Sequence, residues 1–394
     1  MFKWQLINDS ITKDDKTALI DHINIDGVRF TQGSKVRQFE KEWSEWLGVK
    51  HSVFVNSGAS ANYIMVSIMK EMKGYGEVIV PTLGWVSDIS PVVNLGLKPV
   101  FVDVSLETFS TDIEKILPLV NENTIGLTLV HCLGFNSISQ QIIDLCKDKD
   151  IFLIEDCCEA HGATYQEKKV GTLGDVSNFS FYFGHHMTTI EGGMVCTNDD
   201  EIYQYAKMFR SHGMTRLDYL QNDELGMNLQ KKYESLYPDL NPLFTFAVPG
   251  YNMRNQELNA IIGTSQLKRL DYNIQRRVEN LKTWVDTLDS EKFFTDYELE
   301  GNSNFALPLI ILDEDRNRLL RVCDILKRNE VEYRIGTAGG GNQAKQPYLE
   351  KYDFVAGELP NSDYIHHYSL YIGNHPEISK EKIINLCNKL NKES

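Results

Sequence analysis

Short apolar runs alternate with amphipathic stretches along the first half of the chain. The runs at 77–81, 99–104, 125–132 and 151–156 are almost continuously apolar, which is typical of strands buried on both faces. Between them lie helical patterns such as 140–147, where apolar residues recur at helical spacing. This alternation predicts an α/β fold with a mostly parallel central sheet and helices on its faces.

The flanking segments add further expected elements. We expect helices at 12–23, around 33–48, at 63–72 and at 201–211, and a strand at 51–55. Residues 212–250 have weak periodicity and contain several prolines and tyrosines. A loop of that length inside a compact domain is usually functional, so we expect residues 212–250 to form a functional loop.

The second half begins with a helical pattern from 255 to 288, which predicts one long connecting helix. Shorter elements follow at 305–312 and 316–329, and a glycine-rich loop follows at 336–342. We therefore expect a larger domain with an N-terminal arm over 1–250. Residues 251–394 are expected to hold the connecting helix and a smaller C-terminal α+β domain.

Segment 177–198 has the pattern of a strand, a polar turn and a second strand. Phenylalanines alternate with small polar residues up to Phe183, and the strand pattern breaks at Gly184. The pair His185-His186 follows, and the chain returns through Glu-Gly-Gly at 191–193 into the second strand. Such a frame presents the side chains of its turn to a pocket.

Composition limits the classes of partner. The net charge is −15 and the acidic residues are scattered, which argues against a nucleic-acid surface. No apolar run approaches the roughly 20 residues of a membrane span, and residues 1–6 do not resemble a signal peptide. The seven cysteines have no metal-site spacing, so we expect buried, reduced thiols in a cytoplasmic protein and no metal.

The 177–198 segment resembles the cofactor anchor of the DegT/DnrJ/EryC1/StrS sugar aminotransferases, which are fold-type I pyridoxal phosphate enzymes related to aspartate aminotransferase. The family pattern is Phe-Ser-Phe, three residues, a cofactor-binding Lys, and then Thr-Thr-Gly-Glu-Gly-Gly. The lysine position falls on His185, so the chain keeps the frame without the lysine. The resemblance extends over 33–40, 56–62, 81–85, 155–162 and 250–267.

With histidine in place of the lysine, the chain resembles one branch of that family, the nucleotide-linked 4-keto-6-deoxyhexose 3-dehydratases. In that branch, too, histidine replaces the lysine. The resemblance implies that pyridoxal phosphate takes an amino group, with glutamate as the expected donor, and becomes pyridoxamine phosphate. Its amine condenses with the C4 ketone of the sugar, a proton leaves the cofactor's C4′ carbon, and the C3 hydroxyl departs. Hydrolysis then gives a 3-deoxy sugar and ammonia.

Three residues match cofactor-ring positions of the family. Asp156 follows an apolar strand and would keep the pyridine nitrogen protonated, so that the ring acts as an electron sink. Glu159 would face the ring hydroxyl, and Trp85 would stack on the ring. Without the family frame, an exposed helix cap would be the preferred interpretation of Asp156, and a core position would suit Trp85 equally well.

Phosphate and substrate contacts follow from the same resemblance. Ser180 matches a phosphate-binding hydroxyl, and Ala59 and Ser60 match positions whose backbone amides bind that phosphate; a plain strand-to-helix turn would look the same. Asn252 matches a residue that reaches the phosphate of the neighbouring subunit, which implies a homodimer with shared sites. Arg254 and His212 are expected near the sugar nucleotide, although a surface position suits Arg254 as well.

His185 is the expected catalytic base, because imidazole cannot form the lysine's covalent link but transfers protons near neutral pH. His186 would point elsewhere on an extended backbone and is the second choice. His161 suits either a packed position or a ligand contact. Two other functions stay open: a sugar aminotransferase that works without the lysine, and a non-catalytic, cofactor-binding regulatory protein.

Overall fold

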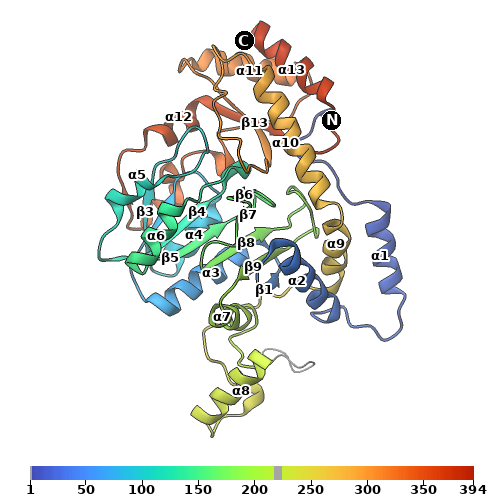
Figure 1. Cartoon of the computed structure of the whole chain (residues 1–394), viewed down its shortest axis with the longest axis vertical. Helices are drawn as coiled ribbons and strands as arrows, with labels where there is room; N and C mark the ends of the chain where they lie inside the picture. The colour runs from blue at the N-terminus through green and yellow to red at the C-terminus, as the bar shows by residue number, and fades with distance from the viewer. Residues whose placement is uncertain (1, 217–223) are drawn as a thin grey trace.

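The computed structural model describes residues 2–216 and 224–394, and its centre is an eight-stranded sheet (Figure 1). The strand order is β1-β9-β8-β5-β4-β2-β3-β12, and β9 alone runs against its neighbours. This confirms the mostly parallel α/β sheet. The strands are β1 His51–Val55, β2 Glu77–Pro81, β3 Lys98–Val102, β4 Thr124–Val130, β5 Phe152–Asp156, β8 Val176–Ser180, β9 Gly193–Thr197 and β12 Val355–Ala356.

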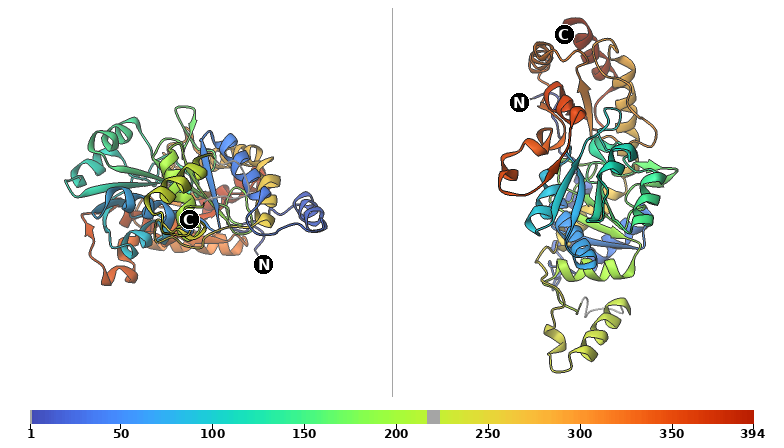
Figure 2. Two further views of the ribbon diagram at one scale, coloured as in Figure 1. Left: turned by 90° about the horizontal axis from the view of Figure 1, so that it is seen from below. Right: turned by 90° about the vertical axis from the view of Figure 1, so that its left-hand side faces the viewer.

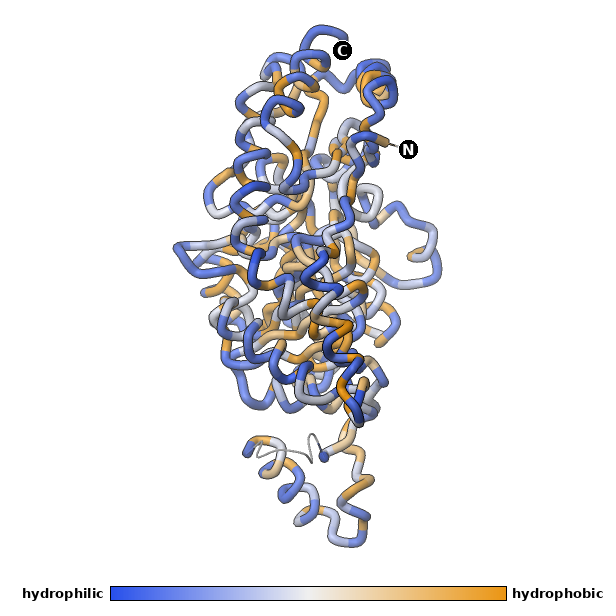
Figure 3. The backbone as a smooth tube through the Cα atoms, turned by 90° about the vertical axis from the view of Figure 1, so that its right-hand side faces the viewer, coloured by the Kyte–Doolittle hydropathy of each residue, from blue (hydrophilic) through white to orange (hydrophobic). Residues whose placement is uncertain are grey.

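Helices cover both faces of this sheet and form two separate apolar cores. One face packs against α2 (Ser34–Leu47), α6 (Gln140–Lys149) and α9 (Glu257–Leu267). The other packs against α3 (Gly58–Lys73), α4 (Val86–Asn94) and α7 (Asp200–Arg210). Hydrophobic segments gather in the interior of the molecule in Figure 3, whereas the outer coils mix hydrophilic and hydrophobic positions.

A second, antiparallel sheet lies above the large sheet in Figure 1, on the side opposite α8. It consists of β10 (Ala306–Ile310), β13 (Ser369–Gly373) and β11 (Tyr333–Ile335), and a third core joins it to α10 (Leu270–Thr287), α11 (Arg316–Arg328) and α13 (Lys380–Glu393). This confirms the smaller C-terminal α+β region. The boundary at residue 250 stays a prediction.

Two segments connect these layers across the sequence. In the N-terminal arm, Trp4 bridges to Val331 and its indole N–H donates to the Gly373 carbonyl at 2.9 Å. Strand β12 comes from the C-terminal half but pairs with β3 at the edge of the large sheet. The other α-helices and strands of the described residues are α1 Lys13–Ile23, α5 Ile113–Ile116, α8 Glu224–Leu236, α12 Pro360–Tyr368, β6 Thr164–Tyr165 and β7 Lys168–Lys169.

Three expected elements differ from the structure. The long helix 255–288 is two helices, because the chain turns at Arg269, whose guanidinium binds the buried Asp15 carboxylate at 2.6 Å. Helix α3 begins at Gly58 instead of residue 63, so much of the expected turn is helical. The expected loop 212–250 contains α8; of its residues, 217–223 lie outside the described chain.

Helix α8 projects away from the body of the molecule (Figure 2). It buries only Gly226 and Leu229, so its sequence needs no continuous apolar face and gives a weak helical pattern. Within the described residues, no helix combines the length and apolarity that crossing a membrane requires.

The buried Glu257 carboxylate holds the start of α2 and offers a stability test. It accepts the backbone N–H groups of Gly33 at 2.9 Å, Lys35 at 3.0 Å and Val36 at 2.9 Å. We expect Glu257→Ala to lower the free energy of unfolding by about 3 kcal/mol, because it leaves one buried and two partly buried N–H donors unpaired. Urea denaturation measures this loss. Glu234→Ala on the exposed α8 is the control, and an equal loss in both variants would contradict the capping role.

Candidate active site

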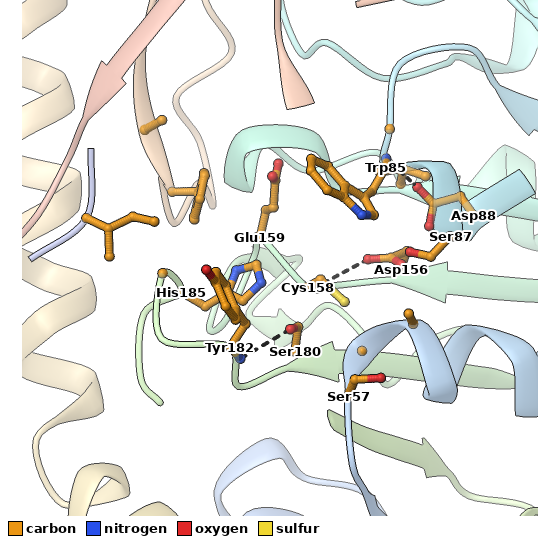
Figure 4. Close-up of a pocket in the computed structure, with 18 of the residues that line it drawn as sticks. Ser57, Trp85, Ser87, Asp88, Asp156, Cys158, Glu159, Ser180, Tyr182 and His185 are labelled. Atoms are coloured by element: carbon orange, nitrogen blue, oxygen red, sulfur yellow. Dashed lines mark hydrogen bonds between the residues drawn. The ribbon is translucent and has the colours of Figure 1, made fainter. Parts of the chain in front are cut away.

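A pocket of about 390 Å³ opens between the two sheets (Figure 4). The carboxyl ends of β5 and β8 and the N-termini of α3 and α4 form one wall. The N-terminal arm and the second sheet contribute Leu6, Arg334 and Tyr371 to the other. Six residues predicted from the sequence line this single pocket: Ala59, Trp85, Asp156, Glu159, Ser180 and His185.

Asp156 ends β5 and is 5% exposed, so it is no surface helix cap. Its Oδ1 accepts the Cys158 N–H at 2.9 Å. Its Oδ2 accepts the side-chain amides of Asn62 at 2.8 Å and Asn178 at 3.1 Å. Three N–H donors stabilise a negative charge at the pocket wall, where it can pair with a cationic ring nitrogen.

Trp85 and Glu159 also face the pocket (Figure 4). Trp85 precedes α4 and is 50% exposed, so its ring is not part of the core. The Glu159 carboxylate accepts the Leu133 N–H at 2.7 Å. Burial, reinforced by the charge of Asp156, raises the pKa of Glu159 to about 7 against the effect of that N–H. Near neutral pH, Glu159 is therefore able to donate or accept a proton.

Ser180 and the first turn of α3 form one corner of the pocket, the Ser180 corner. A Cβ atom on Gly58 would lie 2.7 Å from the Ser180 Cβ, so glycine allows the helix start to approach the strand end. Ser57 caps the helix and takes the Ser60 N–H at 3.0 Å. Ser60 lies outside the residues that line the pocket, whereas Gly58 and Ala59 line it. A hydroxyl beside a helix N-terminus suits a phosphate group.

His185 lies in the loop after β8, and its ring centroid is 6.0 Å from that of His161 and 5.4 Å from that of Phe305. Among the described residues, its buried Nδ1 atom has no hydrogen-bond partner. Burial and the Arg277 charge lower its pKa to about 4, although Asp156 opposes them. The imidazole is therefore neutral at physiological pH and available as a proton acceptor.

Three other histidines are structural in this geometry. His186 is 2% exposed, lies outside the pocket lining, and its Nε2 is 3.0 Å from the Ser303 carbonyl oxygen. The loop around it is not the extended strand that the expectation assumed, and of the two histidines only His185 lines the pocket. His161 is fully buried beneath both rings. His131, which follows β4, lies 3.2 Å from Glu155 inside the core.

His131 and Glu155 also form, with Cys157, a buried trio close enough for metal ligands. The Glu155 carboxylate already accepts backbone N–H groups from Gly171 at 2.9 Å, Leu173 at 2.9 Å and Gly174 at 2.6 Å. Burial raises the pKa of the Cys157 thiol well above its usual value. The trio is therefore already engaged as a hydrogen-bonded core cluster.

Asn252 and Arg254 lie elsewhere, on a second depression of about 600 Å³. Both side chains are exposed, and Glu191 borders both pockets. His212 lines neither pocket, and its N–H donates to the Tyr251 carbonyl at 2.5 Å. Within one chain, the structure therefore does not bring Asn252, Arg254 or His212 to the main pocket, and their roles stay predictions.

Several lining residues were not expected from the sequence. Arg334 and Tyr371 come from the second sheet, whose approach to this pocket no local pattern indicates. Cys158 lines the pocket with a pKa raised well above its usual value by burial, so it carries a neutral thiol. Asp88 also lines it, and its position three residues after Trp85 was the available signal.

Comparisons with known proteins agree with this arrangement. Residues 10–391 match the sequence profile of the DegT/DnrJ/EryC1/StrS aminotransferase family. The chain is 33% identical to the GDP-4-keto-6-deoxy-D-mannose 3-dehydratase of Yersinia pseudotuberculosis over 97% of each chain. It is 29% identical to the GDP-perosamine synthase of Vibrio cholerae over 96% of each.

The fold has a close match among solved structures. One is a GDP-4-keto-6-deoxymannose-3-dehydratase with a trapped PLP-glutamate geminal diamine. It is 28% identical, has a TM-score of 0.86, and the match covers 99% of this chain and 100% of that one. The fold expected from the resemblance, that of a pyridoxal phosphate-dependent transferase, is therefore confirmed.

The three clustered histidines predict a loss of stability in acid. Burial, with Arg277 nearby, lowers the pKa of His185 to about 4 and those of His161 and His186 well below their usual value. Below about pH 6.5 these histidines bind protons in the unfolded chain but not in the native chain. The free energy of unfolding therefore decreases as the pH is lowered. We expect His185→Asn to flatten this fall by up to about 1.4 kcal/mol per pH unit.

Urea denaturation between pH 7 and 4 measures the effect. His367→Asn on α12 is the control, because that ring is outside the cluster. Parallel curves for the wild type and His185→Asn would contradict a neutral, half-buried His185.

Proposed function

The chain belongs to the DegT/DnrJ/EryC1/StrS aminotransferase family, and from this we propose that it is a 3-dehydratase of nucleotide-linked 4-keto-6-deoxyhexoses. L-Glutamate is the proposed amino donor. The observation that carries the proposal is His185. It takes the place of the family's lysine and lines one pocket with Asp156, Trp85 and Ser180.

The pocket residues fit pyridoxal phosphate, which supplies an electron sink and an amino group when bound. Asp156 would pair with the ring nitrogen, Glu159 would contact the ring hydroxyl, and Trp85 would cover one ring face. Ser180 and the first amides of α3 would hold the phosphate. No lysine lies between Lys169 and Lys207, so we propose that the cofactor is held by non-covalent contacts in this segment.

His185 acts as the base in this proposal. A neutral imidazole beside the ring site accepts a proton at a ring nitrogen, and the lowered pKa keeps it unprotonated before the reaction. Arg277 holds the loop in place, because its Nη2 donates to the His185 carbonyl at 3.5 Å and its Nη1 donates to the Phe305 carbonyl at 2.9 Å.

A second candidate is a sugar aminotransferase, because the chain is also similar along its length to GDP-perosamine synthase. Incubation of the protein with pyridoxal phosphate, glutamate and a 4-keto sugar nucleotide separates the candidates. A 3-deoxy sugar with ammonia supports the dehydratase, and a stable amino sugar supports the aminotransferase. No turnover with any such nucleotide would point to a non-catalytic role.

We expect His185→Asn to reduce the rate of deoxygenation by about 10²–10⁴-fold, since asparagine fills similar space but accepts no proton at neutral pH. Cofactor binding should persist. Product analysis by mass spectrometry measures the rate, with His51→Asn at the edge strand β1 as the control. A near wild-type rate in His185→Asn would show that the base is wrong, and His186→Asn would be measured next.

We further propose a homodimer whose two sites each use both chains. Asn252 and Arg254 are exposed on the second depression, which adjoins the main pocket at Glu191. In this arrangement they complete the pocket of the neighbouring subunit, and Asn252 contacts the phosphate bound there.

Complementation between two variants tests the shared site. His185→Asn and Asn252→Ala should each have low activity alone. Co-expressed, half of the dimers are mixed and carry one intact site, so activity should return to about a quarter of the wild-type value. If Asn252 instead belongs to the active site of its own chain, every site of the mixed dimers is defective, and co-expression does not restore activity.

A further inference from the structure

A second buried carboxyl lies beside Asp156, and the proposed function gives it no role. Asp88, on α4, is 4% exposed and lines the main pocket. Its Oδ1 accepts the side-chain amide of Asn62 at 3.1 Å. The same Asn62 nitrogen donates to Asp156 Oδ2 at 2.8 Å. One amide nitrogen therefore bridges the two carboxyls, whose side chains lie together at the pocket wall (Figure 4).

We infer that Asp88 is a cofactor-positioning residue that shares one proton with Asp156 in the empty pocket and passes it to a ring nitrogen bound against Asp156. The inference rests on the proposed cofactor site. The O–H bond of the carboxyl pair breaks as the ring N–H bond forms, and no electrons are exchanged. The pair is left doubly ionised, and the cationic ring offsets the second charge.

The surroundings of Asp88 support a shared proton. Two carboxylates this close and this buried cannot both ionise without a compensating cation. Burial first, and then the negative charges of Asp156 and Glu159, raise the pKa of Asp88 well above its usual value. The Trp85 N–H opposes this shift.

Two further titratable groups face this corner, and both are neutral in the relevant range. Burial, with the nearby carboxylates, raises the pKa of the Cys158 thiol well above its usual value. Burial and the Asp88 charge raise the pKa of Tyr348 to about 12. Among these groups, the raised pKa values that bear on protonation near neutral pH are those of Asp88 and Glu159.

A helix cap alone explains only part of this geometry. Asp88 Oδ2 accepts the Trp85 N–H at 2.9 Å, as an acid in the first turn of a helix often does. That contact leaves the amide bridge from Oδ1 to Asp156 unexplained. Asp88→Asn separates the two roles, because an asparagine oxygen still accepts the Trp85 N–H but cannot share an acidic proton.

Stability without cofactor is the first measurement. A carboxyl with a raised folded-state pKa destabilises the native chain as pH rises above its unfolded value of about 4. We therefore expect the urea midpoint of Asp88→Asn to exceed that of the wild type at pH 8, with the gap closing toward pH 4. A gap that is independent of pH, or of opposite sign at pH 8, would overturn the shared proton.

Proton uptake on binding of pyridoxal phosphate is the second measurement. Calorimetry in two buffers of different ionisation enthalpy should show that the wild type takes up about one proton fewer than Asp88→Asn, because its own pair supplies that proton. Asp112→Asn, which alters a capping acid at the start of α5, is the matched control and should behave like the wild type. Equal uptake in the wild type and Asp88→Asn would overturn the inference.

The two measurements separate this inference from the proposed function. Proton uptake and pH-dependent stability are read without turnover, so failure of the deoxygenation assay leaves both intact. If Asp88→Asn does not fold, Asp88→Ser retains a hydroxyl acceptor for the Trp85 N–H and is measured in the same way.

Discussion

The close approach of the α3 N-terminus to β8 and β9 determines the geometry of the whole site. Gly58 permits it on the Ser180 side, and on the other side a Cβ atom at Gly193 would lie 2.3 Å from the Ser57 carbonyl oxygen. Any larger side chain at either glycine would force the helix start away from the sheet. The Ser180 corner depends on this contact. The loop that carries His185 depends on it too, because that loop leaves the sheet after Ser180 and returns to it at Gly193.

Burial gives the pocket its distribution of charge. His185 is neutral and the Glu159 pKa is raised to about 7, whereas Asp156 is surrounded by N–H donors. Neighbouring side chains of this pocket therefore differ in how readily they hold a proton or a negative charge. Such separation assigns proton-accepting and charge-pairing roles to neighbouring side chains.

The sequence predicted the layers of this fold better than its irregular parts. Continuous apolar strands specify a buried parallel sheet, so β2 to β5 were recognisable without a structure. Helix α8 was missed because it buries so little, and the break at Arg269 was missed because a contact with Asp15, distant in sequence, determines it. The six lining residues came from the motif frame, whereas the Asp88–Asn62–Asp156 bridge depends on three separate elements and leaves no local pattern.

Strand β12 has a mechanical consequence. The chain leaves the small sheet at β11, pairs with the edge of the large sheet through Val355–Ala356, and returns along α12 to β13. Any rotation of the small sheet relative to the large one must therefore shear these pairs or bend the linking segments. The pairing of β12 with β3 therefore restrains such a rotation at this edge of the large sheet, and the N-terminal arm meets the pocket with Leu6.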